Sequence, residues 1–230
     1  MIKKKPKTVS PLNIGNLMTV SGIILPVLVH LCLMLLTASF TAAGSFDFEE
    51  TDLDRVKQKF EDGNVFHARM THSFVDSYTG EEEITEGEIW ISKNKYLIKA
   101  GNQTILVDGE TSVVYNEVQN KVLISRYHPE EDDFAPSRFF SGKDEVFAVS
   151  DVRVTNDHAE FTLKPDDPFE IFTSVTILLG GDLVPLEISA VDQMENNMST
   201  AFNDAGFLDN SDGIFSLDYP EDAEIIDLRK

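Results

Sequence analysis

The chain is poor in cysteine. Its 230 residues include one cysteine, Cys32, which lies inside an uncharged N-terminal run. The rest of the chain therefore has no thiol, which excludes disulfides, cysteine nucleophiles and thiolate metal sites there. The preceding residues, Val29, His30 and Leu31, are not the small residues of a lipobox, so we do not expect Cys32 to carry a lipid.

Positive charge is scarce as well. Lysine and arginine number 19, against 40 aspartates and glutamates, and four of the lysines precede residue 8. Without those four, the net charge is −25. Such a surface repels nucleic acid and anionic lipid headgroups, so no nucleic-acid partner is expected. A solvated acidic face, tuned to a salty habitat, is the plainest explanation of this charge.

The first 43 residues differ from the rest. Lys3, Lys4, Lys5 and Lys7 form a basic head, and the segment 17–43 contains no charged residue. A basic region followed by an apolar region is typical of a secretory signal peptide, here residues 1–43, with cleavage expected after its small-residue end. The apolar run is also long enough to span a bilayer, which leaves a retained membrane anchor as the alternative.

The remaining residues, 44–230, predict one domain, because a chain of this size builds one ordinary core. The apolar residues Leu53, Val56 and Phe60 recur at helical spacing before Gly63, which predicts an amphipathic helix over about 50–62.

From Val65 the apolar pattern changes to a period of two, which predicts strands. In the first half the expected strands are 65–76, 84–91, 95–100, 104–108, 112–117 and 121–127, joined as an antiparallel meander because the connections are short. In the second half they are 146–154, 158–164, 171–179, 184–192, 197–204, 213–218 and 224–228. Between the halves, Pro136 and the aromatic residues after it predict a short helix that ends at Gly142.

The two sets of strands differ in their faces. Ala159, Phe161 and Leu163 alternate cleanly with polar residues, which predicts a sheet covered on one side, whereas Ile89 and Trp90 show that the first half needs cover on both. A sheet of ten or more strands curls. We therefore predict a mainly β fold: an incomplete (open) antiparallel β-barrel of about eleven strands, with short α-helices forming a lid over an apolar cavity.

No constellation of catalytic residues competes with that interpretation. His67 and His72 differ in strand parity and should face opposite ways, which disfavours a metal site. The segment 209–213 has its glycine in the wrong place for a calcium loop and is expected to be a turn. The known nucleophile, zinc and phosphate motifs are absent from the sequence. We therefore expect no enzyme activity, no cofactor and no metal.

Several motifs, in order, resemble the outer-membrane lipoprotein carrier (LolA) family. They are the first strand at Phe66, Ala68 and Met70, the strand Gly87–Ile91, the hairpin Ile105–Asn116 around Asp108-Gly109, the proline-started segment Pro136–Phe140, and the sequences FTLKPDD, PLEISAVDQMENN and PEDAEIIDLRK. The resemblance covers most of the chain from about Leu53 to Lys230.

The resemblance implies a monomeric periplasmic carrier. Members of that family hold the acyl chains of triacylated lipoproteins in a hollow closed by helices. They receive the lipoproteins from an inner-membrane ABC-type releasing complex and pass them to an outer-membrane acceptor. Family members often carry an arginine that holds the lid; Lys93 stands nearby here and is the expected lid contact, without the planar two-pronged donor of arginine.

Candidate cavity residues are apolar side chains on the expected strands and lid, with Trp90 on the opposite face. They are Phe66, Met70, Ile89, Ile91, Val107, Val113, Tyr115, Phe139, Phe140, Ile177, Leu179 and Ile188. For each, a place in an ordinary core is the competing interpretation. Whether Ile105 and Val107, or instead Leu106 and Val114, face the cavity is left open.

Three functions are consistent with the sequence. The first is a lipoprotein carrier with no chemistry of its own. The second is a periplasmic binding protein for another lipid or glycolipid. The third is a membrane-tethered interaction protein whose signal is retained and whose core is filled.

Overall fold

The computed structural model describes residues 52–132, 146–155, 157–211 and 213–229. The expected signal peptide and the expected lid residues Phe139 and Phe140 lie outside these residues. Among those described, no helix is long and apolar enough to cross a membrane. Contacts divide the chain into two units, 1–44 and 45–230, and all of the described residues belong to the second.

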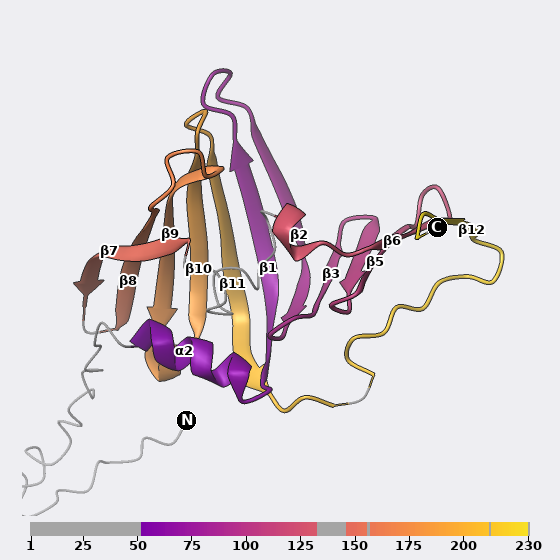
Figure 1. Cartoon of the computed structure of the whole chain (residues 1–230), viewed down its shortest axis with the longest axis horizontal. Helices are drawn as coiled ribbons and strands as arrows, with labels where there is room; N and C mark the ends of the chain where they lie inside the picture. Colours follow the sequence, from indigo (N-terminus) through magenta and orange to yellow (C-terminus); the bar gives the residue numbers. More distant parts are fainter. Residues whose placement is uncertain (1–51, 133–145, 156, 212, 230) are drawn as a thin grey trace, which may run out of the picture. The chain divides into compact units, whose positions relative to one another are not determined.

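Most of the second unit is one open sheet (Figure 1). Its twelve strands are β1 (Val65–Val75), β2 (Glu82–Ile91), β3 (Tyr96–Ala100), β4 (Gln103–Val107), β5 (Thr111–Asn116), β6 (Lys121–Arg126), β7 (Phe147–Val154), β8 (His158–Pro165), β9 (Phe172–Gly180), β10 (Pro185–Asp192), β11 (Asn197–Leu208) and β12 (Glu224–Asp227). In the described part of the chain, one α-helix, α2 (Asp52–Glu61), and two 3₁₀ turns, η1 (Pro129–Glu131) and η2 (Gly181–Leu183), accompany them. The expected mainly β, open architecture is confirmed.

The order of strands across the sheet is β12-β6-β5-β4-β3-β2-β1-β11-β10-β9-β8-β7. Two antiparallel meanders, β1 to β6 and β7 to β11, therefore meet where β1 pairs with β11. β12 is the exception, because it returns through a long connection and pairs parallel with β6.

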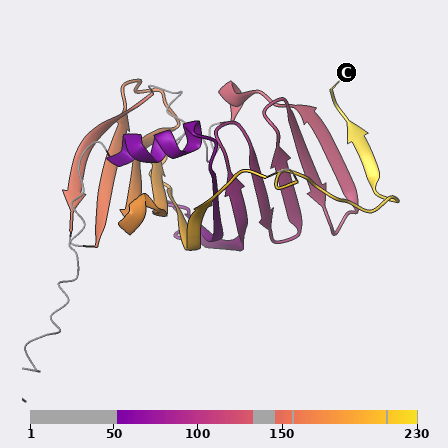
Figure 2. The ribbon, with the colours of Figure 1, turned by 90° about the horizontal axis from the view of Figure 1, so that it is seen from below.

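The strand expected at 213–218 is wrong. β11 continues to Leu208, and the chain then forms turns and irregular structure up to β12. Gly213 adopts a φ of 98°, and its carbonyl accepts a hydrogen bond from the Ser216 hydroxyl at 2.7 Å, so this segment bends locally instead of extending. In Figure 2 the segment runs across the strands of the first half. The ring of Tyr219 lies 6.4 Å from that of Tyr115, which supplies part of the cover that the second face needs.

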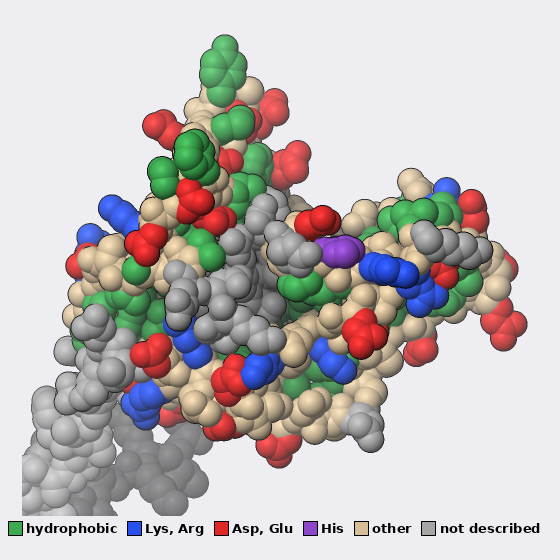
Figure 3. All heavy atoms as spheres, in the orientation of Figure 1, with side chains coloured by type: hydrophobic (Ala, Val, Ile, Leu, Met, Phe, Trp, Pro, Cys, Tyr) green, Lys and Arg blue, Asp and Glu red, His purple; other side chains and the backbone are tan. Residues whose placement is uncertain are grey.

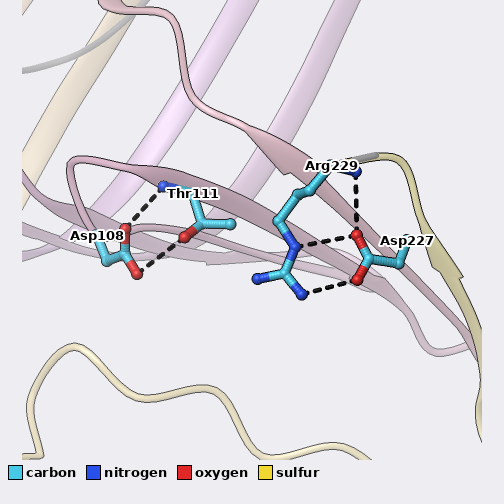
Figure 4. Close-up of polar contacts among 4 residues, drawn as sticks. All are labelled: Asp108, Thr111, Asp227 and Arg229. Carbon is cyan, nitrogen blue, oxygen red and sulfur yellow. Dashed lines mark hydrogen bonds and ion pairs between the residues drawn. The ribbon is translucent and has the colours of Figure 1, made fainter.

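The C-terminal end of β12 is fixed by backbone and side-chain contacts. The N–H of Leu228 donates to the carbonyl of Ile124 at 2.8 Å. Beyond it, the guanidinium of Arg229 donates from Nε and Nη2 to the carboxylate of Asp227, at 3.0 and 2.7 Å (Figure 4). This hydrogen-bonded ion pair raises the pKa of Arg229. Charged side chains of this kind on an edge strand discourage pairing with a further strand.

Helix α2 covers one face of the sheet at one end of the strands. Its Leu53, Val56 and Phe60 are fully buried, as the helical spacing predicts. Two acids, Asp52 and Asp54, lie in its first turn, where negative charge interacts favourably with the positive end of the helix dipole. Gly63, at a φ of 90°, follows the helix in the left-handed conformation typical of a C-terminal cap.

Candidate functional site

An apolar pocket of about 260 Å³ lies on the face of the sheet that α2 also covers. It spans the junction of the two meanders, with residues from β1, β2 and β3 on one side and from β9, β10 and β11 on the other. The lining residues are Met70, His72, Ile89, Ile98, Phe172, Ile188, Ala190, Met198, Thr200 and Phe202. None of these described residues carries a carboxylate, an ammonium or a guanidinium group.

The end of the face beneath α2 is closed. Phe66 packs edge-on against Phe202 and Phe207, with ring centroids 5.2 and 5.7 Å apart, and Phe60 of the helix lies 5.4 Å from Phe207. These aromatic rings fill this end of the face. The free volume therefore lies further along the strands, toward the turns at their opposite ends.

The structure places the predicted cavity residues in four different surroundings. Met70, Ile89 and Ile188 line the pocket. Phe66, Ile91, Ile177 and Leu179 share its face but are fully buried in the core beside α2. Strand parity identified their face, whereas their position along the strand decides whether they meet a pocket or the helix.

Three further candidates lie on β4 and β5, away from the pocket. Val107 is buried with Tyr96 in a separate small cluster. The hairpin that follows it pairs Ile105 with Val114, so Ile105, Val107 and Val114 share the pocket's face. Val113 and Tyr115 therefore lie on the other face, because neighbouring residues of a strand alternate. Val113 and Tyr115 were predicted to line the same cavity as Val107, and the strand register shows that this was wrong.

The turn between these strands is held by Asp108, whose Oδ1 accepts the backbone N–H groups of Glu110 and Thr111 at 2.9 and 2.8 Å. The Thr111 hydroxyl donates to Oδ2 at 3.2 Å (Figure 4). Burial alone would raise the pKa of Asp108, but these donors outweigh it and hold the pKa below its usual value. The expected Asp-Gly turn thus fixes the register of the hairpin.

Lys93, the expected lid contact, forms an ion pair with Glu61 on α2. The segment Pro136–Phe140 expected to form the lid lies outside the described residues. Lys93 therefore fastens the one described α-helix to the sheet next to the end of β2.

Two polar residues enter the pocket, and the sequence interpretation missed both as lining residues. Nδ1 of His72 lies 2.9 Å from Oγ1 of Thr200 on the neighbouring β11. Burial lowers the pKa of the half-buried His72, which favours the neutral ring. Its place on the face of Phe66 and Met70 was available from strand parity, but its polarity argued against a cavity role.

On the opposite face, His67 stacks on Trp90 with ring centroids 4.7 Å apart. His67 and His72 therefore face opposite ways, and the described residues contain no group of three or more potential metal-ligating side chains. Trp90 is half-buried there, and the ammonium of Lys99 lies 5.5 Å from its ring.

Five more lining residues, all apolar, were not among the candidates. They are Ile98, Phe172, Ala190, Met198 and Phe202. Met198, Thr200 and Phe202 do alternate along β11, but polar Thr200 interrupts the apolar pattern. The signal that could have found these β11 residues is the pairing of β11 with β1, which sequence periodicity does not contain.

Comparison with known proteins identifies a similar fold. No family model and no curated protein matches the chain. A solved structure of an uncharacterized conserved protein from Thermus thermophilus has a TM-score of 0.51 at 11% identity, covering 77% of this chain and 98% of that one. At this identity the likeness shows a shared fold.

Two other solved structures are more distant. A LolA superfamily protein from Nitrosomonas europaea has a TM-score of 0.40 at 10% identity, covering 75% of this chain and 99% of that one. A putative outer membrane lipoprotein-sorting protein domain from Vibrio parahaemolyticus has a TM-score of 0.39 at 11% identity, covering 70% and 93%.

Proposed function

We propose that the protein is a periplasmic carrier that binds acyl chains of lipoproteins and ferries them from the inner membrane toward the outer membrane. The observation that carries the proposal is the pocket of about 260 Å³, whose described lining has no charged side chain. The signal-like N-terminus supports it. So do the family-like motifs, which follow one another in the family's order between Phe66 and Lys230.

The energetics give such a carrier a purpose. Each buried methylene is worth about 0.8 kcal/mol, so a chain of roughly fifteen methylenes holds a lipoprotein in a bilayer with about 12 kcal/mol. A soluble carrier must offset much of that with apolar contacts and still release its cargo. Met70 and Met198, with flexible side chains, suit a lining that adapts to different chains.

The size of the pocket limits what it holds as it stands. At about 260 Å³ it lies below the roughly 300–1,000 Å³ typical of small-molecule sites. A ligand with several acyl chains therefore requires the pocket to widen. We propose that widening occurs toward the turns, because the other end is filled by Phe60, Phe66 and Phe207.

The lining also bears on the ligand's polar end. A fatty-acid carboxylate buried here would have no cationic partner among the described lining residues, which is costly. A neutral ester or amide carbonyl needs only a hydrogen-bond donor, and the pair His72 and Thr200 offers one. We therefore propose a chain linked as an ester or amide as the ligand.

A hydrolase acting on acyl esters is a second candidate, because Thr200 and His72 are hydrogen-bonded as a nucleophile and a base would be. The described lining offers no carboxylate to orient the histidine and no further polar side chain to stabilise an oxyanion. We propose binding without catalysis. Hydrolysis of a p-nitrophenyl acyl ester that Thr200→Ala abolishes would favour the enzyme instead.

The decisive experiment is purification of the exported protein from its own periplasm, followed by mass spectrometry of what it carries. We expect acylated protein fragments, and we expect the purified protein to release lipoproteins from spheroplasts. Recovery of a free lipid or glycolipid alone would favour the second function. N-terminal sequencing tests the retained anchor, because a mature chain that starts at Gly44 has lost it.

A further inference from the structure

Three turns at the end of the sheet remote from α2 share one construction. They are 76–81 between β1 and β2, 166–171 between β8 and β9, and 192–196 between β10 and β11. In each, an aspartate is followed two positions later by a large apolar residue: Asp76 by Tyr78, Asp167 by Phe169, and Asp192 by Met194.

The aspartates fix the apolar residues directly. Oδ1 of Asp76 accepts the backbone N–H of Tyr78 at 3.0 Å, Oδ1 of Asp167 accepts that of Phe169 at 2.9 Å, and Oδ1 of Asp192 accepts that of Met194 at 2.8 Å. Turns closed in this way have a defined backbone, so each apolar side chain starts from a fixed position.

The same three side chains are largely exposed. Tyr78, Phe169 and Met194 are 96%, 91% and 70% exposed. Single exposed apolar residues are ordinary, but a group of them marks an interaction site. In Figure 3 hydrophobic side chains stand at the tip of the described part, with acidic side chains around them.

Hydrogen bonds join the turns into one unit. The N–H of Ser77 donates to Oδ1 of Asn196 at 2.9 Å, and its hydroxyl donates to the carbonyl of Met194 at 2.7 Å. Nε2 of Gln193 donates to the carbonyls of Pro168 and Glu170 at 3.0 and 2.8 Å. The turn 192–196 is thus fastened to both others, which lowers the entropic cost of presenting the three side chains together.

The charge of the three turns is of one sign. Together they contain seven aspartates and glutamates and no lysine, arginine or histidine. An anionic membrane surface is therefore repelled. Each tip residue is also only two positions from an aspartate, within about 7 Å along the chain. Insertion of the tips about 5–10 Å into a bilayer would carry those carboxylates into its interface.

We propose that these three turns form a docking surface for a protein partner that presents an apolar cleft ringed by lysine or arginine. Tyr78, Phe169 and Met194 fill the cleft, and the seven carboxylates pair with the basic ring. Phe172, which lines the pocket, comes directly after the turn 166–171, so the partner would dock beside the open side of the pocket. The surface does not depend on the pocket's occupant.

The test is site-specific photocrosslinking in cells that produce the full chain. Benzoylphenylalanine replaces Tyr78, Phe169 or Met194, one at a time. The matched control is Val118, which is 75% exposed on the β5–β6 turn. We expect one protein adduct common to the three tip positions, absent at position 118, mapped by mass spectrometry to a basic region of the partner. Its yield should fall severalfold when membranes from these cells are crosslinked at high salt.

A second arm separates a protein partner from a lipid surface. The purified chain is floated with vesicles of phosphatidylcholine alone or with added phosphatidylglycerol, beside a variant carrying Tyr78→Ser, Phe169→Ser and Met194→Ser. We expect neither protein to float and both to bind an acyl probe equally.

Three results would overturn the proposal: flotation that the triple variant loses, adducts with lipid only, and equal adducts at position 118. None of them concerns acyl binding, so a carrier function could fail while this surface stands, and the reverse.

Discussion

The two ends of the same strands follow different rules. Beneath α2, Phe66 is fully buried and ringed by aromatic side chains; a few residues along β1, Phe74 is half-buried near the turns. One end is packed as an ordinary core, and the other leaves a pocket and exposed apolar turns. The difference teaches that a single sheet face can hold a filled core at one end and leave free volume at the other.

The largest effect is expected from substitutions that compare the two ends on one strand. Phe66→Ala should lower the free energy of unfolding by about 3–5 kcal/mol, because it opens a cavity in a filled core. Phe74→Ala, on the same strand and face, should cost about 1 kcal/mol, since its side chain is only partly buried. Urea denaturation of both variants measures the contrast. Equal losses would mean that the open end is as tightly packed as the closed one.

Filling the pocket should separate binding from stability. Ala190→Phe places a ring among the lining residues and should weaken binding of a fluorescent acyl probe about tenfold, or about 1.4 kcal/mol. Ala201→Phe, one strand away on the opposite face, is the matched control and should leave binding unchanged. Titration of the probe decides between them, and equal weakening by both variants would place the ligand elsewhere.

Releasing α2 should have a smaller effect. Lys93 and Glu61 are each about one-third exposed, so their ion pair is expected to contribute about 0.2–1 kcal/mol. A double-mutant cycle with Lys93→Ala and Glu61→Ala isolates that coupling. A coupling near zero would show that apolar burial alone holds the helix on the closed end.

The smallest expected effect is a pH dependence at the open end. Burial lowers the pKa of His72 below 6.5, so the unfolded chain takes up a proton there before the folded chain does. Stability should hold above about pH 6.5 and fall as the pH drops from there to the folded pKa. His72→Gln should remove that part of the slope in thermal melts, since all other titrating groups are common to both chains. An unchanged slope would contradict the burial of this ring.

The periodicity of the sequence predicted most of the helix and strand positions. It did not predict which apolar side chains lie in the filled core and which line the pocket. Helix 50–62 and the approximate ranges of the twelve strands follow from periodicity and turn residues such as Asp108-Gly109. Periodicity cannot distinguish Phe66 from Met70, because both lie on the same face. They differ only in their position along β1: Phe66 lies at the end that α2 covers, and Met70 lies at the pocket. It also could not foresee that 213–218 crosses the sheet, since alternation of apolar residues in a turn-rich segment looks like a short strand.

Gly87 shows what a motif contributes beyond periodicity. A Cβ at this position would overlap the carbonyl oxygen of Lys99 and press on Ala100. The glycine therefore permits β2 and β3 to approach closely next to the pocket. Its place in the family-like strand Gly87–Ile91 was visible in the sequence, but its reason is visible only in the pairing.

The pairing of β1 with β11 also determines when the pocket can form during synthesis of the chain. Met70 and His72 come from β1, while Met198, Thr200 and Phe202 come from β11, more than a hundred residues later. Contacts so distant in sequence form late and slow the folding of the chain. A chain emerging N-terminus first therefore has no pocket until β11 has followed it, so an unfinished molecule lacks the site that the complete one presents.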